Sequence, residues 1–306
     1  MTDSSVPDAV RRLVDERRQA REARDWARAD ALRDEIATLG WEVQDGARGS
    51  TARPILRPAE RDELPSLLAD PAEVATSVQV VADDHPEDLS RFLRGLAAHS
   101  PSGPWELVIV ANEPSYDLDA LLADAPLPAA MTVLPTEGRL GWADARTLGL
   151  TRSRGEVTVL IDTSLEPAGD WSSPLLAAFD DPAVGIAGGW GVTSRDARQF
   201  EDAPPGEVDA IEGYCLAVRR DALRRVGGFD RRFRFYRNAD LDFSFAVRDA
   251  GWRAVRTPPL PFERHEHRGW TSMPESERDR LSKRNFYRFL DRWGDRPDLL
   301  LHGGDE

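Results

Sequence analysis

Short apolar runs alternate with amphipathic segments along the chain from residue 77 onward. The apolar runs cover residues 77–82, 105–111, 131–134 and 157–161, and segments with helical spacing lie between them at 86–99, 117–124 and 141–153. Nearly continuous apolar runs are typical of parallel strands that are buried on both faces and joined by crossover helices. The pattern therefore predicts an α/β domain.

The second half of the chain is less regular. It predicts a long strand over residues 208–219, a helix over 221–226, a helix over 240–250 ended by Gly251, a strand over 252–256 and a last helix over 275–293.

The first forty residues predict a helical hairpin. Apolar residues recur with helical spacing over 8–24 and 25–39, with Asp25 as the cap of the second helix and Gly40 as its left-handed end. Residues 45–58 are rich in Gly, Arg, Ser, Thr and Pro, and we expect an extended connector there. The predicted parts are a hairpin with its connector at 1–58, a linker at 59–75 and the α/β domain at 76–306.

Composition narrows the function classes. The net charge of −14 over 306 residues argues against broad sequence-independent binding to nucleic acid. Cys215 is the only cysteine, so a disulfide framework is excluded and a reducing, cytoplasmic location is expected. The start of the chain has no signal-peptide pattern, and no apolar window is long enough to predict a transmembrane helix.

Acidic and polar residues follow the predicted strands, where α/β domains bind ligands. The most informative stretch is a predicted helix carrying Arg146, followed by a strand that ends at Asp162-Thr163-Ser164. It resembles family 2 glycosyltransferases, in which a Gly-Ala-Ala-Arg-Asn-like helix precedes a strand ending in Asp-x-Asp. The resemblance implies a GT-A fold, a Rossmann-like mixed sheet flanked by helices, that binds a nucleotide-sugar donor.

In that family the Asp-x-Asp carboxylates hold Mn²⁺ or Mg²⁺ against the donor's diphosphate, since hard oxygen ligands suit a hard dication. Here Ser164 stands at the second acidic position, and Thr147 replaces the motif's Asn. A late histidine completes the metal shell in some GT-A enzymes, so His265 and His267, two apart on a predicted extended segment, are further candidates. Ordinary surface or hydrogen-bonded histidines are the alternative.

The resemblance also implies donor and acceptor residues. For the nucleotide it points to Asp83 or Asp84, of which Asp84 is our choice, and to Glu113. Arg146 either supports the phosphates or buttresses the Asp162 loop.

Residues 209–230 and 238–253 resemble the family's acceptor region, including its Val-Gly-Gly-Phe-Asp and Glu-Asp-x-Asp elements. The implied acceptor-side residues are Glu212, Gly213, Asp230 and Asp242. Ala239 replaces the motif's Glu, which leaves Asp240 as the candidate base of an inverting transfer. The alternative is that Asp240 is only a charge at the start of a helix and that Asp242 is a packing or capping partner.

The hairpin has a likeness of its own. Residues 10–52 resemble the small helical C-terminal domain of cysteinyl-tRNA synthetases, which implies a contact with tRNA or protein. Its arginines are interspersed with as many acidic residues, so a solvated, salt-bridged face is the other interpretation.

Two functions remain in view. The first is a metal-assisted glycosyltransferase that acts on an unidentified acceptor. The second is a non-catalytic binding module, favoured by the replacements at Ser164 and Ala239.

Overall fold

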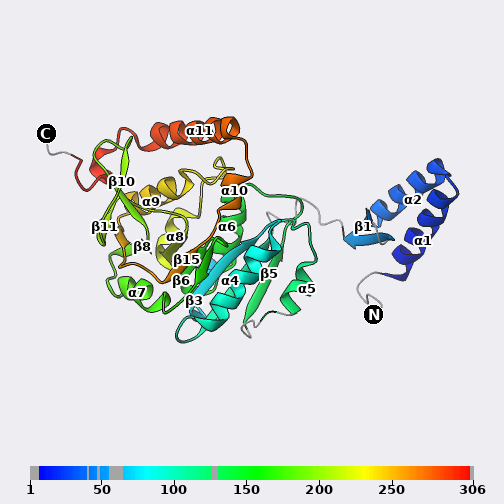
Figure 1. Cartoon of the computed structure of the whole chain (residues 1–306), viewed down its shortest axis with the longest axis horizontal. Helices are drawn as coiled ribbons and strands as arrows, with labels where there is room; N and C mark the ends of the chain where they lie inside the picture. Colours follow the sequence, from blue (N-terminus) through cyan, green and yellow to red (C-terminus); the bar gives the residue numbers. More distant parts are fainter. Residues whose placement is uncertain are drawn as a thin grey trace. The chain divides into compact units, whose positions relative to one another are not determined.

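Two compact units, Met1–Pro65 and Ser66–Glu306, make up the chain in the computed structural model (Figure 1). The structure describes residues 7–39, 41–46, 49–54, 65–123, 125 and 130–303. Much of the predicted linker at 59–75 lies outside this part, and the large unit's first strand begins at Val74, before the predicted residue 76. Each unit is described by itself.

The small unit contains the two predicted helices, α1 (Asp8–Glu22) and α2 (Trp26–Thr38). Their buried apolar residues face each other: Val10, Ala20, Ala29, Leu32 and Ile36. The Asp25 carboxylate accepts a hydrogen bond from the Arg28 amide at 3.1 Å, which confirms the predicted cap. Gly40, the predicted end of α2, is outside the described residues.

The expected connector at 45–58 is wrong in its described part. Two strands, β1 (Trp41–Gly46) and β2 (Gly49–Pro54), pair as an antiparallel hairpin, with Trp41 opposite Pro54. Val43 of β1 packs against Val10 and Ile36, so the strand hairpin covers part of the apolar stripe of the two helices. Gly and Pro here mark strand ends.

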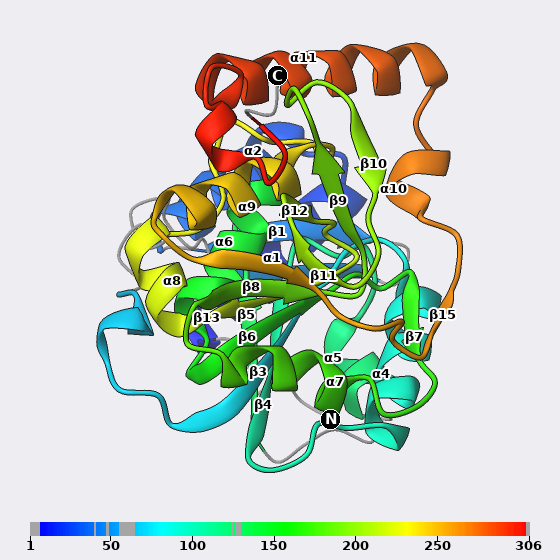
Figure 2. The same cartoon turned by 90° about the vertical axis from the view of Figure 1, so that its left-hand side faces the viewer.

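An eight-stranded mixed sheet forms the large unit, in the order β11-β14-β8-β13-β6-β3-β4-β5 (Figure 2). Its parallel half confirms the four predicted strands: β3 (Val74–Ala82), β4 (Trp105–Ala111), β5 (Met131–Pro135) and β6 (Gly155–Ile161). The mixed half comprises β13 (Cys215–Arg219), antiparallel to β6 and to β8 (Val184–Gly188), then β14 (Arg253–Arg256) parallel to β8, and β11 (Gly206–Val208) antiparallel to β14.

The predicted long strand over 208–219 is wrong. It is divided into β11, β12 (Ala210–Ile211) and β13, because β12 leaves the main sheet to pair with β9 (Gly191–Ser194), whose other neighbour is β10 (Phe200–Asp202). The buried Asp209 carboxylate fixes this break by accepting the amides of Ser194 at 2.7 Å and Leu301 at 2.8 Å. The chain then turns at Glu212-Gly213 before β13.

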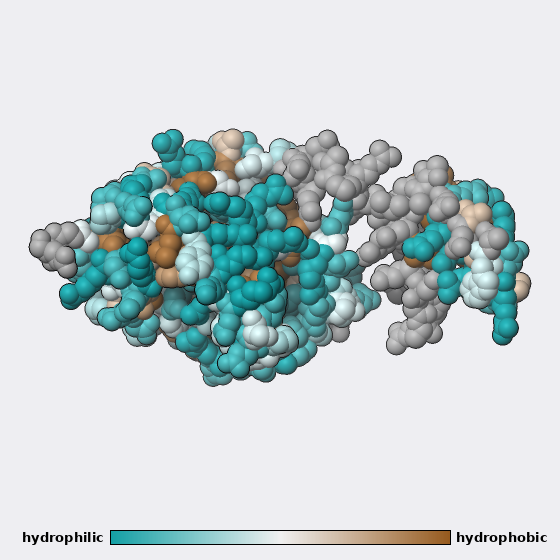
Figure 3. Space-filling view, turned by 90° about the horizontal axis from the view of Figure 1, so that it is seen from above, coloured by the Kyte–Doolittle hydropathy of each residue, from teal (hydrophilic) through white to brown (hydrophobic). Residues whose placement is uncertain are grey.

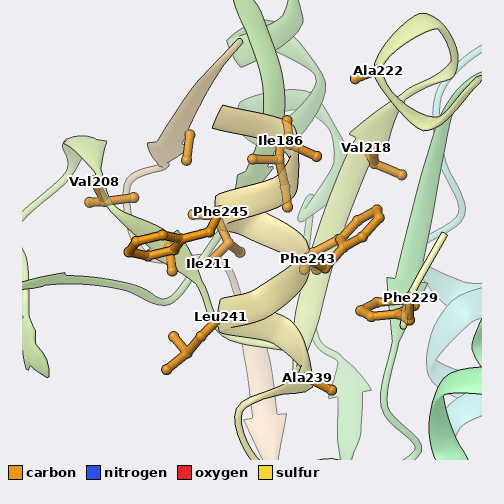
Figure 4. Packing of buried hydrophobic residues seen from close by; sticks show 14 of the residues in the cluster. Ile186, Val208, Ile211, Val218, Ala222, Phe229, Ala239, Leu241, Phe243 and Phe245 are labelled. Atoms are coloured by element: carbon orange, nitrogen blue, oxygen red, sulfur yellow. The ribbon is translucent and has the colours of Figure 1, made fainter. Parts of the chain in front are cut away.

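Helices cover both faces of the sheet, as the crossover pattern predicts (Figures 1 and 2). One core lies under α4 (Pro86–Ala98), α5 (Leu118–Ala123) and α7 (Ser172–Ala177). The other lies under α6 (Trp142–Arg152), α8 (Arg220–Val226) and α9 (Ala239–Asp249), with α11 (Glu275–Trp293) packed on α9. Figure 4 shows Phe243 and Phe245 of α9 pointing to opposite sides of that second core.

The remaining elements are short: η1 (Leu67–Ala69), β7 (Leu165–Pro167), η2 (Ala178–Asp180), β15 (Phe262–Arg264), α10 (Arg268–Thr271) and η3 (Pro297–Leu299). The face seen in Figure 3 is mainly hydrophilic, with small apolar areas between polar ones. In the part of the chain that the structure describes, every helix is too short or too polar to cross a membrane.

The close approach of α6 to β3 positions the site described below. At Gly149 of α6, an added Cβ would lie 2.4 Å from Cγ of Gln79 on β3. The Gln79 side chain is fully buried and accepts a hydrogen bond from Arg146, so it has no free space to move into. Only glycine lets the helix lie this close to the strand.

We predict that Gly149→Ala destabilises the protein by about 1–2 kcal/mol. Overpacking against Gln79 costs up to about 3 kcal/mol, and the higher helix propensity of alanine offsets about 1 kcal/mol of that cost. Denaturant unfolding of the full chain measures the difference. A variant as stable as the native protein or more stable would show that the α6–β3 contact is loose.

Candidate active site

Asp162 stands at the carboxyl end of β6, at the start of a tight turn. Its Oδ1 accepts hydrogen bonds from the Ser164 hydroxyl at 2.6 Å and the Ser164 amide at 3.0 Å. Its own amide donates to the Tyr214 carbonyl at 2.9 Å. Ser164 is buried, and its hydroxyl proton is committed to Asp162, so Oδ2 of Asp162 is the atom left to face a ligand.

Arg146 holds this loop from beneath. The buried guanidinium donates to Gln79 Oε1 at 3.1 Å and to the Ile161 carbonyl at 3.2 Å, and its Nη2 lies 3.6 Å from Asp162 Oδ2. Burial raises the pKa of Asp162, but the charges of His267 and Arg146 and the Ser164 hydrogen bonds outweigh burial and lower it. Asp162 is therefore a carboxylate at neutral pH, and Arg146 acts as its buttress.

His267 approaches the same carboxylate. Its Nε2 lies 3.7 Å from Asp162 Oδ2, and its ring packs on Tyr236 with centroids 4.6 Å apart. Two ligand atoms that are each about 2.1 Å from one cation lie at most about 4.2 Å apart, so this pair fits a divalent metal ion.

The structure does not bring His265 to that position. Its Nε2 lies 2.9 Å from Glu166 Oε2, and its amide donates to the Ser164 carbonyl at 2.7 Å. The expectation that both imidazoles face one metal fails because β15 ends at Arg264, so strand alternation no longer governs residues 265–267.

A cavity of about 270 Å³ opens on one side of Asp162. Asp83, from the end of β3, lines it. Asp84 is not among the lining residues, and it pairs at 2.5 Å with Arg139, which is one of them. Burial raises the pKa of Asp83. Glu113 is exposed, and its backbone carbonyl accepts a hydrogen bond from Arg139 Nη2 at 3.3 Å. Of the two neighbouring aspartates, the structure therefore puts Asp83 into the cavity.

A second cavity, of about 560 Å³, opens on the other side. Its floor contains Glu212, Gly213 and Asp240, the second residue of α9. Asp240 Oδ2 accepts the Gly213 amide at 2.9 Å, and Oδ1 accepts the Leu241 amide at 3.0 Å. Burial raises the pKa of Asp240, and the pKa of Glu212 is raised by burial and then by Asp240 and Asp202.

The two cavities adjoin. Both are lined by Trp142, Asp162, Tyr236 and His267. A molecule in the first cavity can therefore meet a molecule in the second beside Asp162, with Asp240 on the far side.

Asp230 and Asp242 line neither cavity. Asp242 is buried, and its carboxylate accepts hydrogen bonds from Trp293 Nε1 at 2.8 Å and Arg292 Nη1 at 3.0 Å. Asp230 pairs with Arg232 at 2.6 Å. Asp242 anchors α11 to α9, as a packing partner would, and Asp230 is held in a local ion pair outside any helix.

Sequence reasoning missed several residues that line the first cavity: Arg139, Arg234, Tyr236 and Arg268. A signal was present over residues 232–235, where arginines alternate with phenylalanines. Phe233 and Phe235 are buried there, and Arg232 and Arg234 are exposed. Period-two alternation of this kind indicates an extended segment with one face toward solvent.

A mixed sheet with helices on both faces, an aspartate loop after β6 and two adjoining cavities together define a GT-A glycosyltransferase domain. The sequence pattern described as glycosyl transferase family 2 matches residues 77–257. The chain therefore belongs to glycosyl transferase family 2, a family of enzymes.

Individual relatives agree with this assignment. Pre-mycofactocin glycosyltransferase from Mycobacterium tuberculosis is 27% identical over 165 residues, which is 48% of this chain and 33% of that protein. The crystal structure of GalNAc-T7 with UDP, GalNAc and Mn²⁺ is similar with a TM-score of 0.59 and 17% identity, over 72% of this chain and 49% of that chain. The structural likeness shows the fold.

The small unit has separate relatives. The pattern described as the cysteinyl-tRNA ligase anticodon binding domain matches residues 3–53. Cysteine–tRNA ligase from Chlamydia caviae is 47% identical over 47 residues, which is 15% of this chain and 10% of that protein. The chain spans about a third or less of the length of these curated relatives.

Proposed function

We propose that this protein transfers a sugar from a nucleotide-diphosphate donor to an acceptor hydroxyl, with inversion at the anomeric carbon. The observation that carries the proposal is the pair of cavities that adjoin at Asp162 and His267, with Asp240 in only the second. The donor diphosphate occupies the first cavity and the acceptor the second.

In the proposed reaction the acceptor oxygen bonds to the anomeric carbon while the bond from that carbon to the diphosphate oxygen breaks. Asp240 takes the acceptor's proton, and the nucleoside diphosphate leaves. Its carboxylate is oriented by the Gly213 and Leu241 amides, and its raised pKa makes it a stronger base than an exposed aspartate. Attack from the side opposite the leaving group inverts the configuration.

Asp162 and His267 would hold Mn²⁺ or Mg²⁺. When bound, the cation neutralises the charge of the departing diphosphate. Arg146 keeps Asp162 in place, and His267 and Arg146 together lower the pKa of Asp162. Ser164 also holds Asp162 in place, through its hydrogen bonds to that carboxylate. His267 would supply the metal ligand that the motif lacks at Ser164. The replacement at Ser164 is the feature that favours the binding module, and a histidine beside Asp162 offsets it, so the arrangement supports the enzyme.

We predict that Asp162→Asn weakens Mn²⁺-dependent nucleotide binding by at least about 100-fold, since loss of a direct ligand exceeds the effect of losing its supporting contacts. Calorimetric titration with the nucleoside diphosphate that binds the native chain measures this. Asp230→Asn is the matched control, because it removes a carboxylate that lines neither cavity, and it should bind normally. Normal binding by Asp162→Asn would exclude Asp162 as the metal anchor.

We predict that Asp240→Asn lowers the rate of nucleotide release from the sugar donor about 1,000-fold, the usual effect of a general base, and leaves donor affinity unchanged. The assay uses water or a simple alcohol as the acceptor. Asp230→Asn, which changes an aspartate outside both cavities, should retain the native rate. An unaltered rate in Asp240→Asn would assign the proton to another group. Because the pKa of Asp240 is raised, the native rate should fall as the pH drops through that raised value.

We infer that the helical hairpin contacts tRNA, on the basis of its match to the tRNA-ligase domain. The exposed Arg12 and Arg24 are candidates for phosphate contacts. The full chain should retard tRNA in a gel at about 50 mM salt, and Arg12→Glu with Arg24→Glu should abolish the shift. The control is Arg225→Glu in the large unit. Absence of a shift in the native chain would direct attention to a protein partner.

A further inference from the structure

The acceptor cavity has a mouth whose charge differs from that of its floor. Glu212 and Asp240 at the floor are half-buried. The mouth is formed by exposed Arg198, Arg237 and Lys283, and Asp202 is the exposed carboxylate beside them. These three cations come from separate parts of the chain: the loop before β10, the loop before α9, and α11.

In the described chain none of these three cations has a carboxylate oxygen within 4.0 Å. Arg198 donates to the Asp196 carbonyl at 3.2 Å, and Arg237 lies over the Trp270 ring at 5.7 Å. Lys283 is the only lysine in the chain. Arginines elsewhere are commonly paired, such as Arg139 with Asp84 and Arg280 with Glu277.

This arrangement is notable because the chain carries a net charge of −14 and has 54 acidic residues to pair with. Three cations that face one cavity without carboxylate partners form a surface that attracts an anion. The negative floor would repel the same anion, so it must lie at the mouth, away from Asp240.

Apolar side chains line part of the same cavity. They are Phe200, Phe286, Val192 and Leu241. Phe200 is fixed by Phe289, with ring centroids 5.7 Å apart. A ligand that reaches from the mouth to Asp240 would therefore lay an apolar body against these rings.

We propose that the acceptor carries an anionic group, a carboxylate or a phosphate, which Arg198, Arg237 and Lys283 bind while its apolar body packs on Phe200 and Phe286 and its hydroxyl meets Asp240. This inference rests on the proposed function, because it assigns the second cavity to the acceptor. It names the acceptor as an anionic alcohol and excludes neutral glycans as its preferred class.

The test compares three probes that share one apolar body: 4-(hydroxymethyl)benzoate, its methyl ester, and 4-(hydroxymethyl)phenyl phosphate. Affinity is measured by calorimetry on the full chain at low ionic strength, where charge contacts are least screened. At least one anionic probe should bind about tenfold more tightly than the ester, as expected for a charge-assisted contact. The anion that binds better identifies the source.

Variants locate the contact. Lys283→Gln should weaken binding of the preferred anion about tenfold and leave ester binding unchanged, and Lys283→Arg should restore it. Arg280→Gln removes one positive charge from the same helix outside the cavity, and it should bind the anion normally.

Equal binding of all three probes, or binding of none, overturns the inference. So does an equal loss in Lys283→Gln and Arg280→Gln, which would reflect overall charge. If Mn²⁺-dependent nucleotide binding persists in the same protein, only the acceptor class is wrong. If nucleotide binding is absent as well, the proposed function fails.

Discussion

The buried guanidinium of Arg146 is the contact on which the site depends. It lies between α6, β3 and the end of β6, where its partners are the Gln79 amide oxygen, the Ile161 carbonyl and Asp162. A buried cation without such partners would cost several kcal/mol. The arrangement requires α6 to lie against β3, which Gly149 allows. Gly149 thus allows the packing that positions Arg146, and His267 and Arg146 together lower the pKa of Asp162.

Two aspartates in neighbouring cavities have opposite electrostatic environments. Asp162 lies beside Arg146 and His267, and its pKa is lowered. Asp240 lies in a half-buried position with amide donors and without an ion-paired cation among the described residues, and its pKa is raised. A carboxylate that binds a cation must stay ionised, whereas one that accepts a proton benefits from a raised pKa. The division of roles that we propose follows this contrast.

The sequence predicted the parallel half of the sheet well, because β3, β4, β5 and β6 are continuous apolar runs with clear helical segments between them. It failed over residues 208–219, where a single apolar stretch serves two different sheets. That division depends on the buried Asp209 and its partners Ser194 and Leu301, which are distant in sequence.

The site residues that belong to local motifs were also found from the sequence. Asp162, Arg146 and Asp240 were named in this way, and each of them lines one or both cavities. We chose Asp84, but Asp83 lines the cavity, because the motif does not show which of two adjacent side chains faces it. His265 and His267 were expected to face the same way as alternate residues of a strand, but β15 ends at Arg264. Asp242 was grouped with Asp240 by spacing, yet its partners Arg292 and Trp293 lie about fifty residues away in α11.

Thermal stabilisation by nucleotides tests the central claim most directly. The full chain would be melted with UDP, GDP, dTDP and ADP, each with and without Mn²⁺. The account predicts that one nucleotide raises the melting temperature only when Mn²⁺ is present, because Asp162 and His267 would hold the cation that neutralises the diphosphate charge. A well-folded protein whose melting temperature is unchanged by every nucleotide with Mn²⁺ would contradict it.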